Sequence, residues 1–194
     1  MRHKNLLFAP LVALALVGCG KKGSPDADSA SATSQTTDTM GTMAGMENKP
    51  AGDANQEFLQ MMVDHHQGMV EMADTAVRKA ATPRVKAEAT KMRAKQREEQ
   101  AKMKDMLKTQ YGEDKMPMVT EGNASMITLL AGASGAAFDR QFREHVIMHH
   151  EEALKMIDQF SSRLTNSELK QMAEKMKVDQ TREIAELRKE LKSS

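Results

Sequence analysis

The chain has few of the residues that stabilise small proteins by covalent links or by stacking. Its 194 residues include one Cys, one Tyr, five Phe and no Trp. A single Cys cannot form an internal disulfide, and it cannot supply the thiolate set of a structural zinc site. Few aromatic rings means few platforms on which nucleic-acid bases stack. With 28 basic and 27 acidic residues the chain also has no basic excess, so we expect no nucleic-acid partner.

Several sequence patterns of metal and haem enzymes are also absent. The chain contains no Glu-x-x-His, no His-Glu-x-x-His and no Cys-x-x-Cys-His. These absences argue against a carboxylate di-iron centre, a zinc protease and covalently attached haem, respectively. Haem held only by His and Met is an open alternative, although the core would offer it few aromatic rings.

The N-terminus predicts export. Arg2 and Lys4 precede an apolar run at 6–17, which is typical of a signal peptide and short for a membrane span. We expect residues 1–18 to be removed as a lipoprotein signal peptide, because the residues before Cys19 resemble a bacterial lipobox. Cys19 would then be lipidated and anchor the protein in the cell envelope, on the periplasmic side. The outer membrane is favoured in a Gram-negative organism, and an ordinary signal peptide with an incidental Cys is the alternative.

Residues 19–53 are rich in small and polar side chains and predict a flexible tether between lipid and domain. Met40, Met43 and Met46 recur at every third position of this segment. They are candidate accessory metal ligands, with an accident of composition as the alternative. Residues 54–194 are enough for one domain with a sizeable core.

Methionine is in clear excess, with 18 copies, and many of them belong to a repeated pattern. Sliding the sequence by 84 positions superimposes two His- and Met-rich segments and the helical segments that follow them. The matched pairs are Phe58 and Phe142, His65 and His149, His66 and His150, Met72 and Met156, Asp74 and Asp158, Ala89 and Ala173, Met92 and Met176, Gln96 and Gln180, Glu99 and Glu183, and Leu107 and Leu191. Agreement over this length indicates an internal duplication.

The first copy predicts two helices. Apolar residues spaced by three and four across 55–80 indicate an amphipathic helix. Thr82 and Pro83 fit a cap and a first-turn proline, so a second helix should span 83–109 and stop near Gly112.

The second copy repeats this arrangement. A third helix is expected at 136–161, and Thr165 with Glu168 reads as the capping box of a last helix. The connection 112–135 between the copies is long, and we expect a short extra helix at 123–131 within it.

Each copy, at about 55–111 and 138–194, is therefore an antiparallel helical hairpin. Two such hairpins joined by one long crossover predict an all-α, ferritin-like four-helix bundle over 54–194. The duplication makes the first and third helices equivalent, so they can face each other and form a site with pseudo-twofold symmetry.

The candidate metal site lies on these two helices, because His65 and His149 fall on the apolar stripes. The candidate ligands are His65, His66, His145, His149 and His150, with Met61, Met62, Met69, Met72, Met148 and Met156. Imidazole and thioether donors suit Cu(I), with Ag(I), Cu(II) and zinc as further possibilities. Methionine also fills irregular core gaps, so part of the set can be core. Asp64 and Glu151 are candidates to orient an imidazole, although surface charge is the commoner role.

The residues at 61–72, with Phe138, Asp139, Phe142 and the segment 148–150, resemble the family catalogued as domain of unknown function 305 (DUF305). The resemblance covers about 55–192, with Gln96, Glu99, Gln180 and Glu183 in the partner helices. It implies an exported bacterial protein with a ferritin-like bundle. Some members of that family are associated with copper or silver binding and with copper resistance.

By this resemblance His65, His66, His149, His150 and the neighbouring methionines map onto the family motif. The two copies differ at two positions, since Met61 corresponds to His145 and Asp64 to Met148. We therefore expect the two halves to bind metal unequally.

Three functions follow from these observations. The first is a membrane-tethered protein that binds copper for buffering, for resistance or for transfer to an unidentified partner. The second is a metal-dependent oxidoreductase of the ferritin-like type, and the third is a structural or interaction module without metal. Nothing in the motifs requires turnover, so binding is favoured over catalysis.

Overall fold

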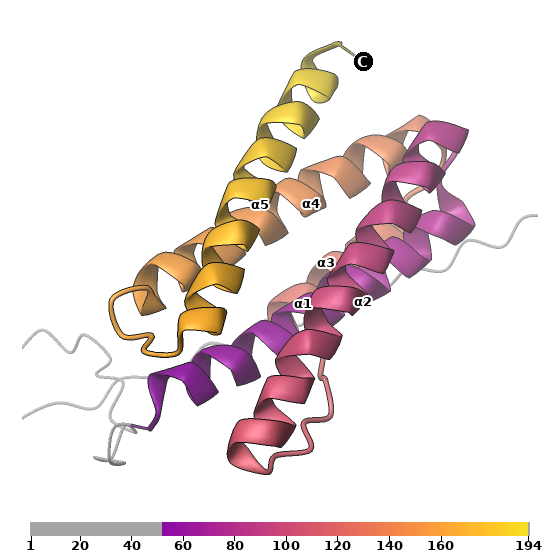
Figure 1. The fold of residues 1–194 in the computed structure, drawn as a ribbon. Coiled ribbons are helices and arrows are strands. Elements are labelled where there is room, and N and C mark those ends of the chain that lie inside the picture. The colour runs from indigo at the N-terminus through magenta and orange to yellow at the C-terminus, as the bar shows by residue number, and fades with distance from the viewer. Residues whose placement is uncertain (1–51, 194) are drawn as a thin grey trace, which may run out of the picture. The chain divides into compact units, whose positions relative to one another are not determined.

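The computed structural model describes residues 52–193, which form five α-helices and contain no strand. They are α1 (Ala54–Lys79), α2 (Pro83–Tyr111), α3 (Glu121–Gly132), α4 (Gly135–Phe160) and α5 (Ser167–Ser193) (Figure 1). The predicted all-α bundle is confirmed, and α3 is the expected extra helix in the long connection. The expected signal peptide, Cys19, Met40, Met43 and Met46 lie outside the described residues. None of the helices within 52–193 combines the length and apolar character that a membrane span requires.

Local chemistry explains where the helices start and stop. The Asp53 carboxylate accepts the N–H of Asn55 at 2.8 Å and caps α1. Thr82 accepts the N–H of Val85 at 3.3 Å and caps α2, with Pro83 at the first helical position as predicted. At the other end of α2, Gly112 takes a left-handed conformation with φ of 66°, which a residue without a side chain adopts readily.

The start of α5 differs from the prediction. Asn166, and not Thr165, caps this helix, because its side-chain oxygen accepts the N–H of Leu169 at 3.0 Å. Thr165 is used elsewhere, since its N–H and its hydroxyl both bond to the Asn55 side chain. The sequence pattern of Thr165 and Glu168 satisfies the capping-box rule, but a contact from the other half of the chain takes up the threonine.

The two hairpins hold each other through crossed contacts. The Asn55 side-chain oxygen at the start of α1 accepts the N–H groups of Thr165 and Asn166, at 2.9 and 3.1 Å, in the turn between α4 and α5. Asp139, at the start of α4, accepts the N–H groups of Ala81 and Thr82, at 2.7 and 3.0 Å, in the turn between α1 and α2. Asn55 and Asp139 are themselves related by the repeat.

Apolar side chains fill the bundle on either side of its middle. One cluster gathers Met69, Met72, Phe138 and Phe142 with residues of α2 and α5. The other contains Phe58 and Phe160, whose rings lie 5.6 Å apart. Both clusters draw on α1 and α4, the helices that carry the His–Met pattern.

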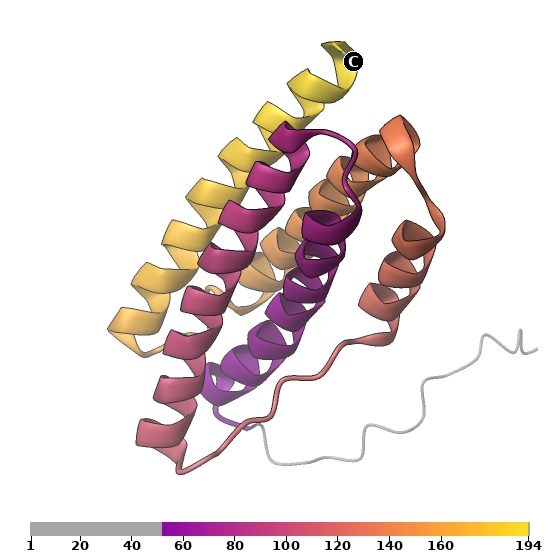
Figure 2. The same cartoon turned by 90° about the vertical axis from the view of Figure 1, so that its right-hand side faces the viewer.

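The short helix α3 lies beside α1 (Figure 2) and also contacts α4. Its Asn123 is buried against Gly68 of α1. A Cβ atom at position 68 would stand only 2.1 Å from Nδ2 of Asn123, so this close approach requires glycine.

Candidate metal site

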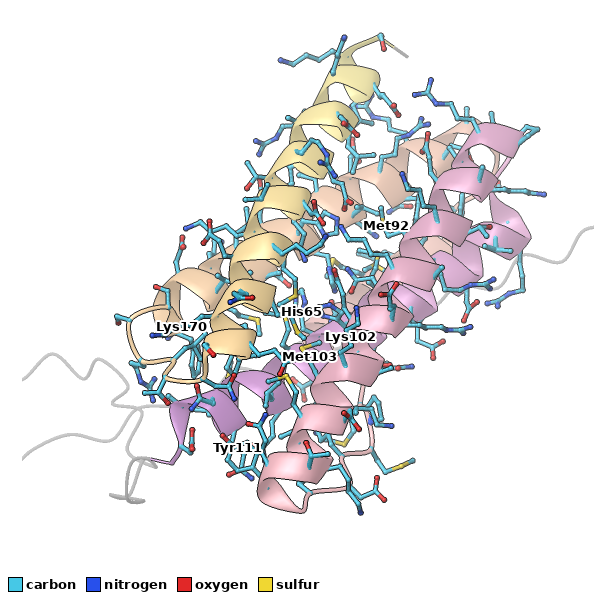
Figure 3. All side chains as sticks on the ribbon, in the orientation of Figure 1. His65, Met92, Lys102, Met103, Tyr111 and Lys170 are labelled. Atoms are coloured by element: carbon cyan, nitrogen blue, oxygen red, sulfur yellow. The ribbon has the colours of Figure 1, made fainter. Side chains whose placement is uncertain are left out.

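The imidazoles of His65 on α1 and His149 on α4 meet in the interior of the bundle. Their ring centroids are 3.7 Å apart, and both side chains are buried. His65 is labelled between the helices in Figure 3. We refer to these two residues as the histidine stack. The duplication placed α1 and α4 as facing helices, and the stack is the point at which the repeat-related rings come together.

A backbone hydrogen bond fixes the orientation of the His149 ring. Its Nε2 lies 2.9 Å from the carbonyl oxygen of His65. A carbonyl only accepts, so Nε2 carries the proton, and Nδ1 of the neutral ring keeps its lone pair. The geometry thus leaves one nitrogen of His149 available as a ligand.

His66 and His150 are oriented by carboxylates of the flanking helices. His66 Nε2 donates to Glu99 of α2 at 3.1 Å, and His150 Nε2 donates to Glu183 of α5 at 2.9 Å. The two pairs are related by the repeat. A carboxylate that holds one imidazole nitrogen while the other stays free is the usual arrangement behind a metal-binding histidine.

All five buried histidines share one unusual property. Within residues 52–193, their Nδ1 atoms are shielded from solvent and have no hydrogen-bond partner; they belong to His65, His66, His145, His149 and His150. Nε2 of His65 also lacks a hydrogen bond, because the nearest carboxylate oxygen, of Glu152, is 3.7 Å away. Leaving a buried polar atom unpaired costs roughly 1–3 kcal/mol, so this concentration of unpaired nitrogens calls for an explanation.

The interior keeps the stack neutral. Burial lowers the pKa of His149 well below its ordinary value, and the nearby rings of His65 and His150 lower it further. Burial also lowers the pKa of His65, although Glu152 opposes this effect, and burial lowers the pKa of His145. Proximity to His65 in turn lowers the pKa of Glu152 more than its own partial burial raises it. Neutral imidazole is the form that binds metal ions.

These shifts predict that the metal-free protein loses stability in mild acid. The folded-state pKa of His149 lies below the unfolded value of 6.5, so below that pH the unfolded chain takes up a proton that the folded chain does not. Stability is complete above pH 6.5 and declines as the pH falls towards the folded pKa. At pH 5.5 we therefore expect a lower free energy of unfolding than at pH 7.5. Urea denaturation at pH 7.5 and 5.5 measures it.

The matched control for this pH dependence is His149→Gln, which removes the titrating ring and keeps an amide donor for the carbonyl of His65. Its stability should fall less between pH 7.5 and 5.5 than that of the unchanged protein. Equal stability of the unchanged protein at the two pH values would contradict the expected burial of a neutral ring.

The candidate methionines divide into interior and surface groups. Met62, Met69 and Met72 are fully buried within the two apolar clusters, and Met156 packs half-buried against one of them. The labelled Met103 of α2 is likewise buried (Figure 3). Helical periodicity placed Met62, Met69 and Met72 on the stripe of His65, and in the structure these three pack in the core.

Met61 and Met148 lie elsewhere. Their side chains are 39% and 47% exposed, although each sits on a helix of the stack. Met61 precedes His65 by one helical turn, and Met148 follows His145 by three residues, so each shares a face with a buried imidazole. Met61 therefore lies on the face of α1 that carries His65, and Met148 lies on the face of α4 that carries His145.

The predicted orienting carboxylates have other partners. Asp64 bonds to Lys115 and to the N–H of Met118, and Glu151 pairs with Arg188. The carboxylates that do hold imidazoles are Glu99 and Glu183. Their signal was present in the sequence, because both stand in the repeat and in the family pattern, but no contact could be deduced from spacing alone.

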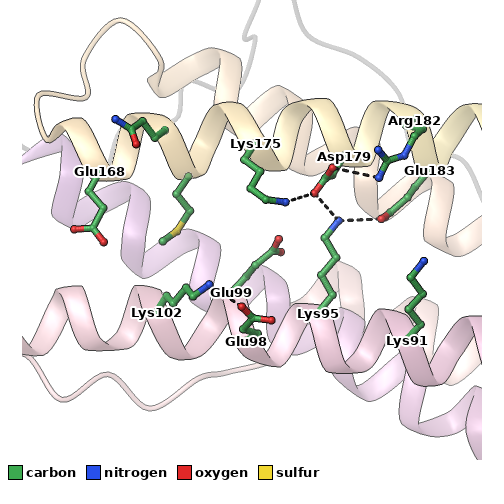
Figure 4. Close-up of a pocket in the computed structure, with 12 residues that line it drawn as sticks. Lys91, Lys95, Glu98, Glu99, Lys102, Glu168, Lys175, Asp179, Arg182 and Glu183 are labelled. Carbon is green, nitrogen blue, oxygen red and sulfur yellow. Dashed lines mark hydrogen bonds and ion pairs between the residues drawn. The ribbon is translucent and has the colours of Figure 1, made fainter.

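A charged groove of about 560 Å³ separates α2 from α5 (Figure 4). Glu99 and Glu183 line it, so they connect the imidazoles of His66 and His150 with the surface.

Lys95 crosses the groove and bonds to Glu183 at 2.9 Å and to Asp179 at 3.2 Å. Burial raises the pKa of Glu183, but the hydrogen bonds from His150 and Lys95 outweigh it and bring the pKa to about 2. The two halves thus differ in charge at this groove, because the first copy has Lys95 where the second has Asp179.

Known proteins resemble the chain in sequence and in fold. The family model described as "Domain of unknown function (DUF4142)" matches residues 40–188, and no curated protein matches the chain. A DUF305 fragment from Deinococcus radiodurans is 23% identical with a TM-score of 0.64, over 75% of this chain and 99% of that one. A DUF305 protein of Streptomyces coelicolor, predicted to be secreted, is 21% identical with a TM-score of 0.63, over 70% and 88%. These two confirm the expected DUF305-type fold.

A third solved structure is more similar in sequence. CopM in its Cu(I)-bound form is 26% identical with a TM-score of 0.62, over 72% of this chain and 96% of CopM. The same protein has also been crystallised in Cu(II)-bound and Ag-bound forms.

Proposed function

Because the chain belongs to the DUF4142 family and shares the DUF305-type fold, we propose that it is a binding protein for soft monovalent metal ions, Cu(I) or Ag(I). The ion is held at the histidine stack between α1 and α4. In this proposal His65 and His149 supply imidazole nitrogen, and Met61 and Met148 supply thioether sulfur from the surface side.

The observation that carries the proposal is the set of five buried histidines with unpartnered Nδ1 atoms. A structural role for a buried imidazole would normally engage both ring nitrogens in hydrogen bonds. Here three of the rings, those of His66, His149 and His150, have Nε2 bonded to an acceptor, which directs the lone pair to Nδ1. Coordination of a metal ion gives such a nitrogen a partner and so offsets the free-energy cost of burying it unpaired.

The donor types favour a soft ion. No three His, Cys, Asp or Glu side chains within 52–193 converge into a group that could hold a metal ion. A coordination sphere at the histidine stack therefore needs further donors, and exposed side chains on the two helices offer the carboxylate of Glu152 and the thioethers of Met61 and Met148. Thioether sulfur remains unprotonated at any biological pH and prefers Cu(I) to Mg²⁺, Ca²⁺ or Zn²⁺.

The comparisons support the same ion class. CopM, which is 26% identical in its Cu(I)-bound form over 72% of this chain, has also been obtained with silver. Among ions accepted by His and Met together, Cu(I) and Ag(I) have the same charge and similar ligand preferences. Cu(II) is a second oxidation state that the imidazoles could hold.

The proposal includes a cellular setting. Residues 1–18 would direct export, and a lipid on Cys19 would hold the bundle at the membrane, where it buffers copper or passes it to a partner. One structural neighbour is a protein predicted to be secreted. Incorporation of labelled palmitate, lost in Cys19→Ala, tests the anchor.

An anaerobic titration with Cu(I) against a chromophoric chelator tests the proposed function. All proteins carry Cys19→Ser, because a lone thiol also binds Cu(I). We expect at least one Cu(I) or Ag(I) per chain to bind in competition with the chelator, with no displacement by millimolar Mg²⁺ or Ca²⁺. Absence of Cu(I) and Ag(I) binding, or a preference for Zn²⁺ over Cu(I), would overturn the proposal.

A further inference from the structure

The segment between α2 and α3 is strapped along α1. The Glu113 carboxylate accepts the side-chain amides of Gln56 and Gln60, at 2.8 and 2.7 Å. Five residues later the Met118 N–H donates to Asp64 at 2.8 Å, and Lys115 bonds to the same carboxylate at 2.7 Å. The three anchoring residues of α1 are four positions apart, so the segment follows the helix axis. We call residues 113–118 the strap.

Burial alternates along the strap. Glu113, Lys115 and Pro117 are half-buried, whereas the residues between them, together with Met118, are exposed. This period of two indicates an extended chain, in which alternate side chains point the same way. Met116 and Met118 therefore both face solvent, with 76% and 62% of their surface exposed.

An exposed thioether gains little from packing, and two of them stand here on one side of a fixed, extended segment. Their Cα atoms are about 7 Å apart at extended spacing. Methionine side chains are unbranched and have three rotatable bonds, so both sulfur atoms can reach one ion. The strap contains two carboxylates and one ammonium group, and Glu121 follows at the start of α3, so the surroundings carry a net negative charge that favours a cation.

A third thioether lies at the same level. Lys115 and Met118 both bond to Asp64, so the strap residue Met116, which stands between them, lies near the level of Asp64 along α1. Met61 precedes Asp64 by three residues, which places both on one side of the helix, and it is 39% exposed.

We propose that Met116 and Met118, with Met61 as a third donor, form a second, solvent-facing site for Cu(I) or Ag(I), distinct from the histidine stack. The site rests on the proposed function only for the choice of ion. Its thioether-only donor set binds more weakly and exchanges faster than the interior, so it collects ions at the surface. Met61 lies one turn from His65 and is a donor that both sites can use.

Titration with Ag(I), followed by NMR of protein labelled with ¹³C at the methionine methyl groups, tests this inference. We expect the Met116 and Met118 methyl resonances to shift, both in the unchanged protein and in His65→Gln/His149→Gln, where the interior site is removed. Met116→Leu/Met118→Leu should bind one fewer Ag(I) per chain with an unchanged circular dichroism spectrum. Met103→Leu, a fully buried methionine on α2, is the matched control and should keep the full stoichiometry.

A further variant separates a built site from two exposed methionines on a loop. Asp64→Ala removes the anchor of Met118, and we expect it to weaken Ag(I) binding at the strap about tenfold, because the donors are no longer held in position. Unshifted Met116 and Met118 resonances alongside metal binding at the histidines would overturn the strap site and leave the proposed function intact. In His65→Gln/His149→Gln, where Met148 no longer has the imidazoles of the stack beside it, binding at Met116 no tighter than at Met148 would also overturn it. Loss of all Ag(I) binding would remove both.

Discussion

Replacing His65 and His149 together by alanine is expected to lower the Cu(I) affinity about a thousandfold, or ~4 kcal/mol. Each substitution removes a buried imidazole, and the thioether donors that remain, Met61 and Met148, are exposed to solvent. The ring centroids of His65 and His149 lie 3.7 Å apart, so an ion bound at the stack would have ligands from both halves of the bundle. Competition titration with a Cu(I) chelator under anaerobic conditions measures the change.

Two further variants keep this test interpretable. Gln at both positions retains an amide near the carbonyl of His65 and a similar volume, so it guards against unfolding of the alanine variant. Gln96→Leu/Gln180→Leu is the matched control, because these residues are also repeat-related and buried, with unpartnered Oε1 atoms. An amide oxygen is a poor ligand for Cu(I), so this control should retain full affinity.

Undiminished Cu(I) affinity in both stack variants would remove the histidine stack as the site. The ions would then bind at other donors, either at the strap or at His66 and His150, whose Nδ1 atoms are also unpartnered. A loss of affinity in the glutamine-to-leucine control as large as in the stack variants would point instead to a general loosening of the bundle.

The second large effect is expected from Gly68→Ala, with a loss of about 3 kcal/mol in the free energy of unfolding. The added Cβ would lie 2.1, 2.3 and 2.7 Å from Nδ2, Cγ and Cβ of Asn123. The obstruction includes the base of the asparagine and not only its flexible end, so α3 must shift away from α1. Urea denaturation of metal-free protein measures the loss.

A double-mutant cycle identifies the cause. Asn123→Gly removes the atoms that obstruct position 68, so Gly68→Ala should cost much less in that background, with an interaction energy of roughly 1–3 kcal/mol. Gly68→Ala protein as stable as the unchanged chain would show that α3 is free to move, and the close packing of α3 on α1 would then contribute little.

The sequence predicted most of the fold because the chain is duplicated. The 84-residue offset identified equivalent helices, and one long crossover between two hairpins left few ways to pack them. The prediction of Thr165 as the N-cap of the last helix was wrong. Thr165 and Asn166 are both good caps, and the choice between them depends on Asn55, which is far away in sequence and engages Thr165.

The candidate site was predictable only in part, because the duplication marks only the residues that both copies share. His65 and His149 stand out because each copy repeats the other, but Glu152, which faces His65, has Gly68 as its repeat mate and carries no such signal. Periodicity also cannot separate a ligand from a core side chain, since Met62 and His65 share one stripe and only packing shows that Met62 is part of the core. Which methionines bind metal stays a prediction.

The crossed contacts of Asn55 and Asp139 have a consequence for the origin of this architecture. Asn55 of the first hairpin accepts the N–H of Thr165 in the turn of the second, and Asp139 of the second accepts the N–H of Ala81 in the turn of the first. Each hairpin therefore supplies the side chain that binds the turn of the other. One hairpin alone would carry half of an isologous interface, the kind through which identical subunits pair about a twofold axis. Fusion through α3 turns that pairing into an event within one molecule, so assembly no longer depends on protein concentration. It also allows the two former subunits to diverge, as Lys95 and its repeat mate Asp179 have done.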